Sequence, residues 1–167
     1  MADDDLAAMA RRVIDGNRYL VLGTVEDDGR PRLSPVYYTP ARYRDFYWVS
    51  SPDAQHSHNV QARPEVQVVV FDSSRPPGDG EAVYAAASAR EVPVDELTDA
   101  LLGEAFDPSR GGRAFTKDEL SGGGDLRLYV AIATAYDVHV PASHPLHGTG
   151  IDRRVPTDPN VTPVAPC

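Results

Sequence analysis

Residues 47–72 place polar side chains directly after an apolar strand pattern. An apolar run leads into Ser51, Pro52 and Asp53, a short polar helical stretch follows, and Pro64 ends that stretch before a second apolar strand. Ser51 suits a helix N-cap and Pro52 suits the first helical position. The N-terminus of a helix offers free backbone N–H groups and partial positive charge to an anion. The sequence therefore predicts a phosphate site here and, with it, a phosphate-bearing cofactor and an enzyme.

The polar side chains of this short helix fit such a site. His56 and Asn59 are three residues apart, and Gln55 and Asn59 are four apart, so these side chains share a helix face. An imidazole donates a hydrogen bond to phosphate, and donates better when it is protonated. The alternative is a surface helix whose polar side chains simply face water.

The second predicted strand offers a wall for a flat ring. Alternation sends Ser34, Val36 and Tyr38 to one side, and Pro35 and Tyr37 to the other. Pro35 indicates a sheet edge or a bulge. The edge would leave backbone groups free to bind the polar rim of a ring. The alternative is that both tyrosines pack the core and its rim.

Charged and metal-binding residue types also gather near the C-terminus. Arg153 and Arg154 follow a glycine-rich turn and could clamp a phosphate or carboxylate, or form an ordinary solvated or ion-paired couple. His139, His144 and His147 could bind a metal, or lie solvated in loops. We expect no metal site and can name no catalytic acid or base.

Composition excludes several classes of protein. The chain has 167 residues and a formal charge of −9, which argues against a nucleic-acid partner. No apolar run is long enough to span a membrane, and the first residues lack a secretory pattern. The only cysteine is Cys167, so no disulfide forms within the chain and a cytoplasmic location is expected. The motifs of P-loop, dinucleotide-binding, α/β-hydrolase and zinc-protease sites are missing.

The elements that must position these residues are mostly short strands. Strands are predicted at 19–25, 31–39, 45–50, 66–72, 81–92 and 126–140, and helices at 3–16 and 94–104. A turn with glycine joins the first two strands, and 107–124 forms a glycine-rich excursion. Tight turns between strands and few helices predict a mainly β (α+β) domain, a small barrel or sandwich.

Combined motifs over residues 8–92 resemble those of the pyridoxamine 5'-phosphate oxidase-like flavoproteins, the FMN-binding split β-barrels. The resemblance rests on Leu22-Gly23-Thr24-Val25 with the following Asp-Gly turn, Pro31 to Tyr37, Tyr47 to Ser51, Asn59 before Arg63-Pro64, Val66 to Phe71, and the segments 82–84 and 87–89.

The resemblance implies a six-stranded antiparallel split β-barrel with Greek-key topology and a few flanking helices. It implies one FMN-binding domain over 1–155, followed by a proline-rich tail over 156–167, and a homodimer with cofactor sites at the subunit interface. By position, the flavin ring would lie against Ser34, Pro35 and Val36. The phosphate tail would face Val49, Ser50, Gln55, His56 and Ser57, and Arg154 is the candidate for a C-terminal arginine.

The chain also departs from the oxidase pattern. Ala54-Gln55-His56 stands where the oxidases carry Ser-Arg-Lys, so an amide and an imidazole replace two cations. A family glutamine near the ring would fall near Ala82. The family's C-terminal tryptophan and arginine pattern for pyridoxal phosphate is also lacking, with Arg153 or Arg154 as its only candidate. Pyridoxamine phosphate oxidation is therefore not the expected activity. The sequence predicts an FMN-dependent oxidoreductase that transfers hydride to or from a small molecule. The alternatives are an F420-dependent reductase, a non-catalytic split barrel that binds haem through a histidine such as His139 or His147, or a structural dimer with an empty cleft.

Overall fold

The computed structural model describes residues 2–161 of the chain. Cys167 and the end of the proline-rich tail lie outside these residues. The strands are β1 (Tyr19–Val25), β2 (Pro31–Tyr37), β3 (Thr39–Ala41), β4 (Asp45–Ser50), β5 (Glu65–Phe71), β6 (Ala82–Glu91), β7 (Arg127–Val140) and β8 (Arg153–Thr157). The helices are α1 (Ala2–Gly16), α2 (Gln55–Ala62) and α3 (Asp99–Ala105), with two single-turn 3₁₀ helices, η1 (Val94–Glu96) and η2 (Pro108–Arg110).

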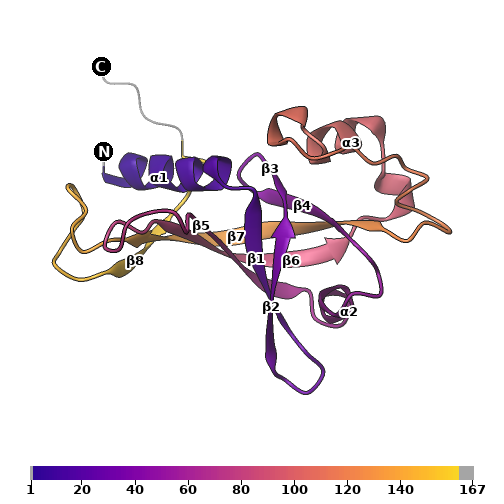
Figure 1. Ribbon diagram of the computed structural model, residues 1–167, viewed down its shortest axis with the longest axis horizontal. Coiled ribbons are helices and arrows are strands. Elements are labelled where there is room, and N and C mark those ends of the chain that lie inside the picture. The colour runs from indigo at the N-terminus through magenta and orange to yellow at the C-terminus, as the bar shows by residue number, and fades with distance from the viewer. Residues whose placement is uncertain (1, 162–167) are drawn as a thin grey trace.

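The strands form one antiparallel sheet in the order β2-β1-β5-β6-β7-β4-β3, and β8 adds to β7 (Figure 1). The sheet is strongly curled, so β2 and β4 approach each other although no ladder joins them. A bulge between Ala86 and Ala87 lies within the β6–β7 ladder and adds to the curl. This is the split β-barrel that the sequence predicted, with β3 and β8 as two short strands beyond the expected six.

The hairpin and the edge strand follow their sequence signals. Gly29 has a φ of 88°, which a glycine adopts without strain, and its N–H donates to the carbonyl of Glu26 at 2.9 Å. β2 ends the sheet order, so Pro35 lies on an edge strand as predicted. The outer edge of β2 pairs with no strand among residues 2–161 and faces the split of the barrel.

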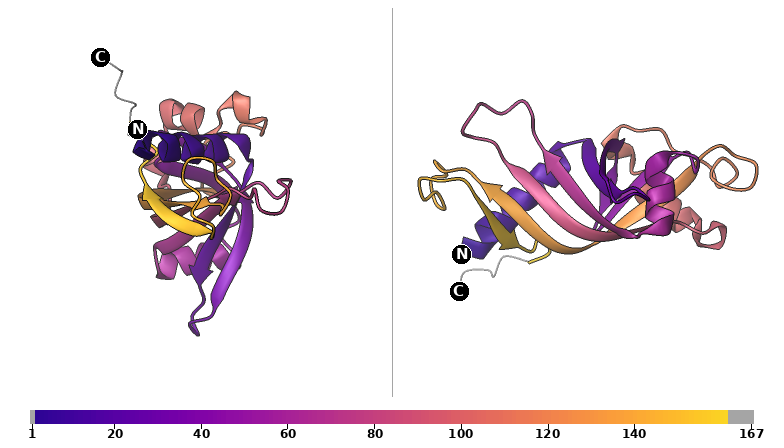
Figure 2. Two further views of the ribbon diagram at one scale, coloured as in Figure 1. Left: turned by 90° about the vertical axis from the view of Figure 1, so that its left-hand side faces the viewer. Right: turned by 90° about the horizontal axis from the view of Figure 1, so that it is seen from below.

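The core occupies the inside of the curl and a smaller region beyond β4. The main cluster joins alternate residues of β1, β4, β5, β6 and β7 to the apolar stripe of α1, which lies across β5, β6 and β8 (Figure 2). Trp48 stacks on Tyr129 in this cluster, with ring centroids 5.4 Å apart. The second cluster lies on the other side of β4, where Tyr47 and Leu128 pack under α3 and the segment that follows it. The two clusters divide the side chains of β4 by strict alternation.

The helix expected at 94–104 is shorter than predicted. Residues 94–96 form the 3₁₀ turn η1, and α3 begins only at Asp99. The Thr98 hydroxyl caps α3 by accepting a hydrogen bond from the N–H of Leu101 at 3.3 Å. The sequence pattern overlooked this threonine cap and placed the start of the helix at residue 94.

Candidate functional site

The end of β4 and the start of α2 form a tight turn over residues 50–57, the β4–α2 turn. The prediction that Ser51 caps the helix is wrong. Ser51 Oγ accepts from the N–H of Asp53 at 3.2 Å, its carbonyl accepts from Ala54 at 3.1 Å, and α2 begins at Gln55 without a side-chain cap. The serine oxygens are used in the turn, so the helix starts later. Among the described residues, no acceptor lies within hydrogen-bonding reach of the backbone N–H groups of Gln55 and His56.

His56 is the titratable group of this turn. Its Nε2 and the Ser50 Oγ share a hydrogen bond at 2.8 Å. Burial, and then the positive charge of Arg32, lower the pKa of His56 below its ordinary value. The imidazole is therefore neutral at pH 7, and it gains a proton only when an anion arrives or the pH falls.

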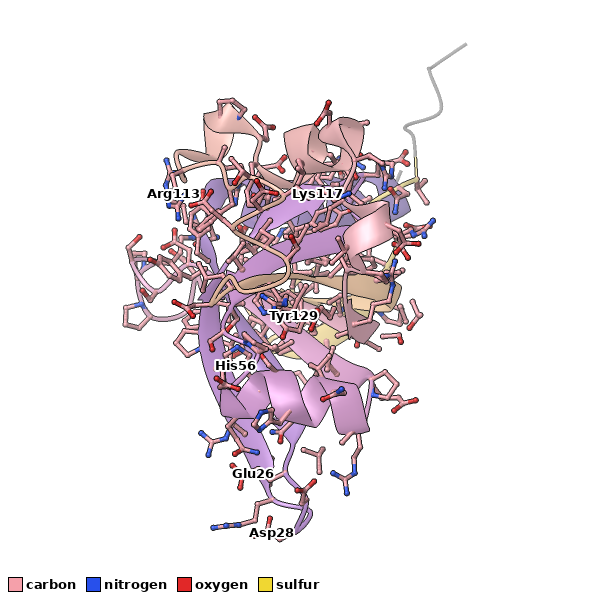
Figure 3. All side chains as sticks on the ribbon, turned by 90° about the vertical axis from the view of Figure 1, so that its right-hand side faces the viewer. Glu26, Asp28, His56, Arg113, Lys117 and Tyr129 are labelled. Atoms are coloured by element: carbon pink, nitrogen blue, oxygen red, sulfur yellow. The ribbon has the colours of Figure 1, made fainter. Side chains whose placement is uncertain are left out.

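Arg32 is a cation that the sequence analysis did not assign to the site. It lies on β2, ion-pairs with Glu26 at 2.6 Å and is near enough to His56 to lower the pKa of the imidazole. Figure 3 shows this end of the molecule, where His56 lies between Tyr129 and the hairpin that carries Glu26 and Asp28. Arg32 precedes the predicted ring wall in the sequence, and this position was the one signal that could have linked it to the site. The sequence did not show that β2 approaches α2.

The remaining polar side chains of α2 fix the helix. Gln55 Nε2 donates to Asn59 Oδ1 at 2.9 Å, and Asn59 Nδ2 donates to the Thr24 hydroxyl of β1 at 3.0 Å. The Ser57 hydroxyl, which is buried, donates to the Ser51 carbonyl at 2.8 Å. The backbone N–H groups of Gln55 and His56 therefore remain open to a ligand, whereas the side chains of Gln55 and Ser57 are occupied in holding the helix and the turn.

The predicted ring wall on β2 divides between two faces. Val36 is buried in the main core, Pro35 is exposed on the outer face, and Ser34 is partly buried. Alternation is thus confirmed, and no single surface carries all three side chains. A ring beside β2 would meet the backbone of the free edge, together with the residues at the strand end.

A cavity of about 330 Å³ opens on the outer side of β4, and we call it the β4 cavity. Val49 lies in its wall, so it adjoins the β4–α2 turn. The lining comes from β2 to β4 and from the chain between α3 and β7: Tyr37, Thr39, Tyr47, Trp48, Val49, Ala105, Phe106, Gly112, Arg113, Phe115, Leu126 and Leu128. The excursion 107–124 is therefore a wall of this cavity, which the sequence pattern did not reveal.

Specific contacts hold the excursion over the cavity. The Tyr37 hydroxyl donates to the Arg110 carbonyl at 2.8 Å, and Arg110 Nη1 donates to the Asp15 carbonyl at 2.7 Å. Gly112 lies so close that a Cβ would approach the Tyr37 ring to 2.8 Å. The backbone can reach the ring only because residue 112 is a glycine.

Arg154 lies far from the β4–α2 turn within one chain. It sits on β8, which Figures 1 and 2 place at the opposite end of the sheet from α2. Its guanidinium ion-pairs with Asp137 at 2.9 Å and lies over the Tyr84 ring at 3.9 Å from the centroid. A second copy of the chain would be needed to bring Arg154 to a cofactor held at this turn.

The C-terminal histidines lie near other polar side chains rather than near one another as a set of three. No group of three or more His, Cys, Asp or Glu side chains within residues 2–161 is placed to hold a metal. His139 faces Asp152 at 3.7 Å, and the His144 and His147 rings lie 5.1 Å apart. Within the same residues, no helix is both long and apolar enough to cross a membrane.

Comparison with known proteins decides the family. The family model for pyridoxamine 5'-phosphate oxidase matches residues 6–123. The chain belongs to the pyridoxamine 5'-phosphate oxidase family. Because this match spans β1 to β6, α2 and most of the excursion, it includes both the β4–α2 turn and most of the wall of the β4 cavity. No curated protein matches the sequence.

Several solved structures share the fold of this chain at low sequence identity. A haem-binding protein from Mycobacterium smegmatis is 19% identical with a TM-score of 0.65, covering 90% of this chain and 57% of that chain. This chain thus spans little more than half the length of that protein. An FAD-binding protein from Mesorhizobium loti is 19% identical with a TM-score of 0.61, and the match covers 79% of this chain and 92% of that chain. An F420 reductase is 20% identical with a TM-score of 0.55, and the match covers 75% of this chain and 94% of that chain.

Proposed function

We propose that this chain binds FMN and acts as a flavin-dependent oxidoreductase that transfers hydride to or from a small molecule. The observation that carries the proposal is the β4–α2 turn in a member of this family. Two free N–H groups, the His56 imidazole and the nearby Arg32 meet there at the start of a helix. These are the donors that a terminal phosphate requires.

The residues present fit FMN at its phosphate and at its ring. Gln55 and His56 would hold the phosphate through their backbone N–H groups, and the His56 side chain would add a further donor. The free edge of β2 would bind the polar rim of the ring, while Val49 supplies an apolar contact at the strand end. When bound, the flavin supplies the hydride-transfer chemistry. The chain orients the ring, holds its tail and excludes water from one side.

The absent cationic pair lowers the affinity that we expect of the β4–α2 turn for the FMN phosphate. Gln55 and His56 replace two fixed charges, and the depressed pKa of His56 keeps its ring neutral at pH 7. Arg32 supplies one charge, but Glu26 already pairs with it. We therefore expect FMN to bind with moderate affinity, and to bind more tightly at low pH.

We further propose a homodimer in which the outer face of β2, β1 and β5 meets its counterpart. This face carries large apolar side chains that are well exposed in one chain, with Tyr19 at 62%, Leu33 at 72% and Phe71 at 48%. Monomeric proteins rarely expose large contiguous apolar patches, so large exposed apolar side chains on one face favour a partner there. Light scattering should give twice the mass of one chain, and Leu33→Glu should shift it towards the monomer.

The direct test is the native protein itself. It should be yellow, release FMN on denaturation, and gain thermal stability when FMN is added to the stripped protein, by about 2.7 kcal/mol at a hundredfold excess over Kd. F420 and haem serve as the competing ligands in the same assay. Stabilisation by F420 alone, or a haem absorption band that disappears in His139→Ala or His147→Ala, would replace FMN with that cofactor. Absence of a response to all three would overturn the proposal.

A further inference from the structure

We propose that the β4 cavity binds the substrate, and that this substrate is an uncharged, flat molecule of about two fused rings. The proposal rests on the proposed flavin function, because Val49 joins the wall of the cavity to the strand end that leads into the β4–α2 turn. It concerns a molecule that lies beside the cofactor rather than the cofactor itself.

The shape and lining of the cavity favour a flat apolar ring. Phe106 and Phe115 pack with centroids 5.4 Å apart in its outer wall, and Tyr37 and Tyr47 line the side next to the sheet. Aromatic walls contact a flat ring with large area at little entropic cost.

The two tyrosine hydroxyls of the lining are already paired within the chain, whereas the buried Trp48 Nε1 has no hydrogen-bond partner among residues 2–161. The Tyr37 hydroxyl donates to Arg110, and the Tyr47 hydroxyl donates to Glu104 Oε1 at 3.1 Å. Burial, and then the Glu104 carboxylate, raise the pKa of Tyr47 to about 12, so this hydroxyl stays protonated. A ligand therefore gains little by offering polar groups to these two tyrosines.

The charge around the cavity disfavours an anionic ligand. Arg113 is the cation of the lining, and it ion-pairs with Glu119 at 2.9 Å while its guanidinium lies 3.6 Å from the Phe115 ring centroid. Glu104, which ion-pairs with Arg42, adds a second carboxylate behind Tyr47. A phosphate or carboxylate ligand would have to displace Glu119 from Arg113 and would be repelled by both acidic side chains.

The volume sets the size of the ligand. A cavity of roughly 150 Å³ lined by apolar side chains accepts benzene. The β4 cavity measures about 330 Å³, so it fits a bicyclic aromatic molecule.

Calorimetric titration with 2-naphthol and 2-naphthyl phosphate tests this assignment, on the stripped protein and on the FMN-loaded protein. We expect 2-naphthol to bind at least tenfold more tightly than its phosphate ester. Glu119→Gln keeps the side-chain shape but frees the charge of Arg113, so it should narrow this difference. Equal affinities in the wild type, or no binding of 2-naphthol, would overturn the proposal.

A matched pair of variants locates the binding. Leu126→Trp places a larger side chain in the partly buried wall, whereas Leu146→Trp makes the same change at a residue that is 69% exposed outside the cavity. Only Leu126→Trp should abolish 2-naphthol binding, with circular dichroism confirming that both variants fold. Equal effects of the two variants would refute the location.

The FMN titration separates this proposal from the proposed function. Simultaneous binding of FMN and 2-naphthol supports a substrate site beside the cofactor. Mutually exclusive binding would assign the cavity to the flavin ring and overturn the inference while leaving the flavin function intact. If 2-naphthol binds as described and FMN does not bind at all, the cavity still binds a neutral bicyclic ligand, and the proposed flavin function is contradicted.

Discussion

The two faces of β4 show how one strand can serve a core and a cavity at once. On the inner face, Phe46 and Trp48 fill the barrel, and Ser50 ends the row against His56. On the outer face, Tyr47 and Val49 border the β4 cavity. The inner side chains are closely packed and lead to a polar turn with free backbone N–H groups. The outer side chains are mainly apolar, and the Tyr47 hydroxyl among them already has a hydrogen-bond partner. Alternation along a single strand therefore separates the proposed anion site from the proposed site for a neutral ring.

The largest expected effect on stability comes from a substitution on the inner face of β4. Trp48→Ala should lower the free energy of unfolding by about 3–5 kcal/mol, because it removes the ring that stacks on Tyr129 and leaves a cavity. Val49→Ala on the outer face removes less surface and adjoins space that already exists, so it should cost about 1 kcal/mol or less. Denaturant titration of both variants checks the contrast. Similar losses would mean that the two faces are packed alike.

The next effect concerns how α2 is fastened to the barrel. Asn59→Ala leaves the buried Thr24 hydroxyl without the amide that donates to it, so we expect a loss of about 1–3 kcal/mol. The exposed neighbour His58 provides the control, since His58→Ala should stay within about 0.5 kcal/mol of the wild type. If both variants unfold alike in urea, the Asn59 hydrogen bond does not position the turn.

The polar turn should respond to pH in two opposite directions. Because the folded pKa of His56 lies below its unfolded value of 6.5, the unliganded fold holds this contribution above pH 6.5 and loses it as pH falls through the folded pKa. FMN affinity should change the other way, since protonation adds a charge-assisted donor for the phosphate. His56→Gln should remove both dependences. Subtracting its profile from that of the wild type cancels the titration of the phosphate itself, whose second pKa is about 6. Parallel profiles for the two proteins would place His56 outside the binding event.

The smallest effect isolates the contribution of Arg32. Arg32→Gln should raise the pKa of His56 but leave it below its ordinary value, because burial is the larger cause of its depression. An NMR titration of the imidazole measures the shift. Arg30→Gln is the control, since Arg30 pairs with Asp28 in the hairpin and is not among the causes of the His56 shift. Equal shifts in the two variants would show a general charge effect rather than a local one.

The sequence predicted the barrel because local signals and the fold agree there. The Asp-Gly turn, the edge proline and the alternation of apolar residues each describe a neighbourhood of a few residues, and each is realised in β1, β2 and β4. The start of α2 was misplaced because the Ser51 oxygens serve the turn rather than the helix. Such competition between local hydrogen bonds cannot be read from residue types alone.

The candidate site was only partly accessible from the sequence, because it combines distant segments. Gln55 and His56 were found through the strand-to-helix pattern. Arg32 and the excursion 107–124 were not, since their approach to α2 and to β4 depends on how the sheet curls. Arg154 matched a family position, but one chain places it at the other end of the sheet.

The proposed function depends above all on binding of the FMN phosphate by the β4–α2 turn. Calorimetric titration of the stripped protein with FMN and with riboflavin, in the wild type and in His56→Ala, tests it most directly because the two ligands differ only in the phosphate. We expect the wild type to prefer FMN and His56→Ala to reduce this preference by about tenfold, as expected for one charge-assisted hydrogen bond. Equal affinities of the wild type for the two ligands, or an equal loss of both in His56→Ala, would contradict it.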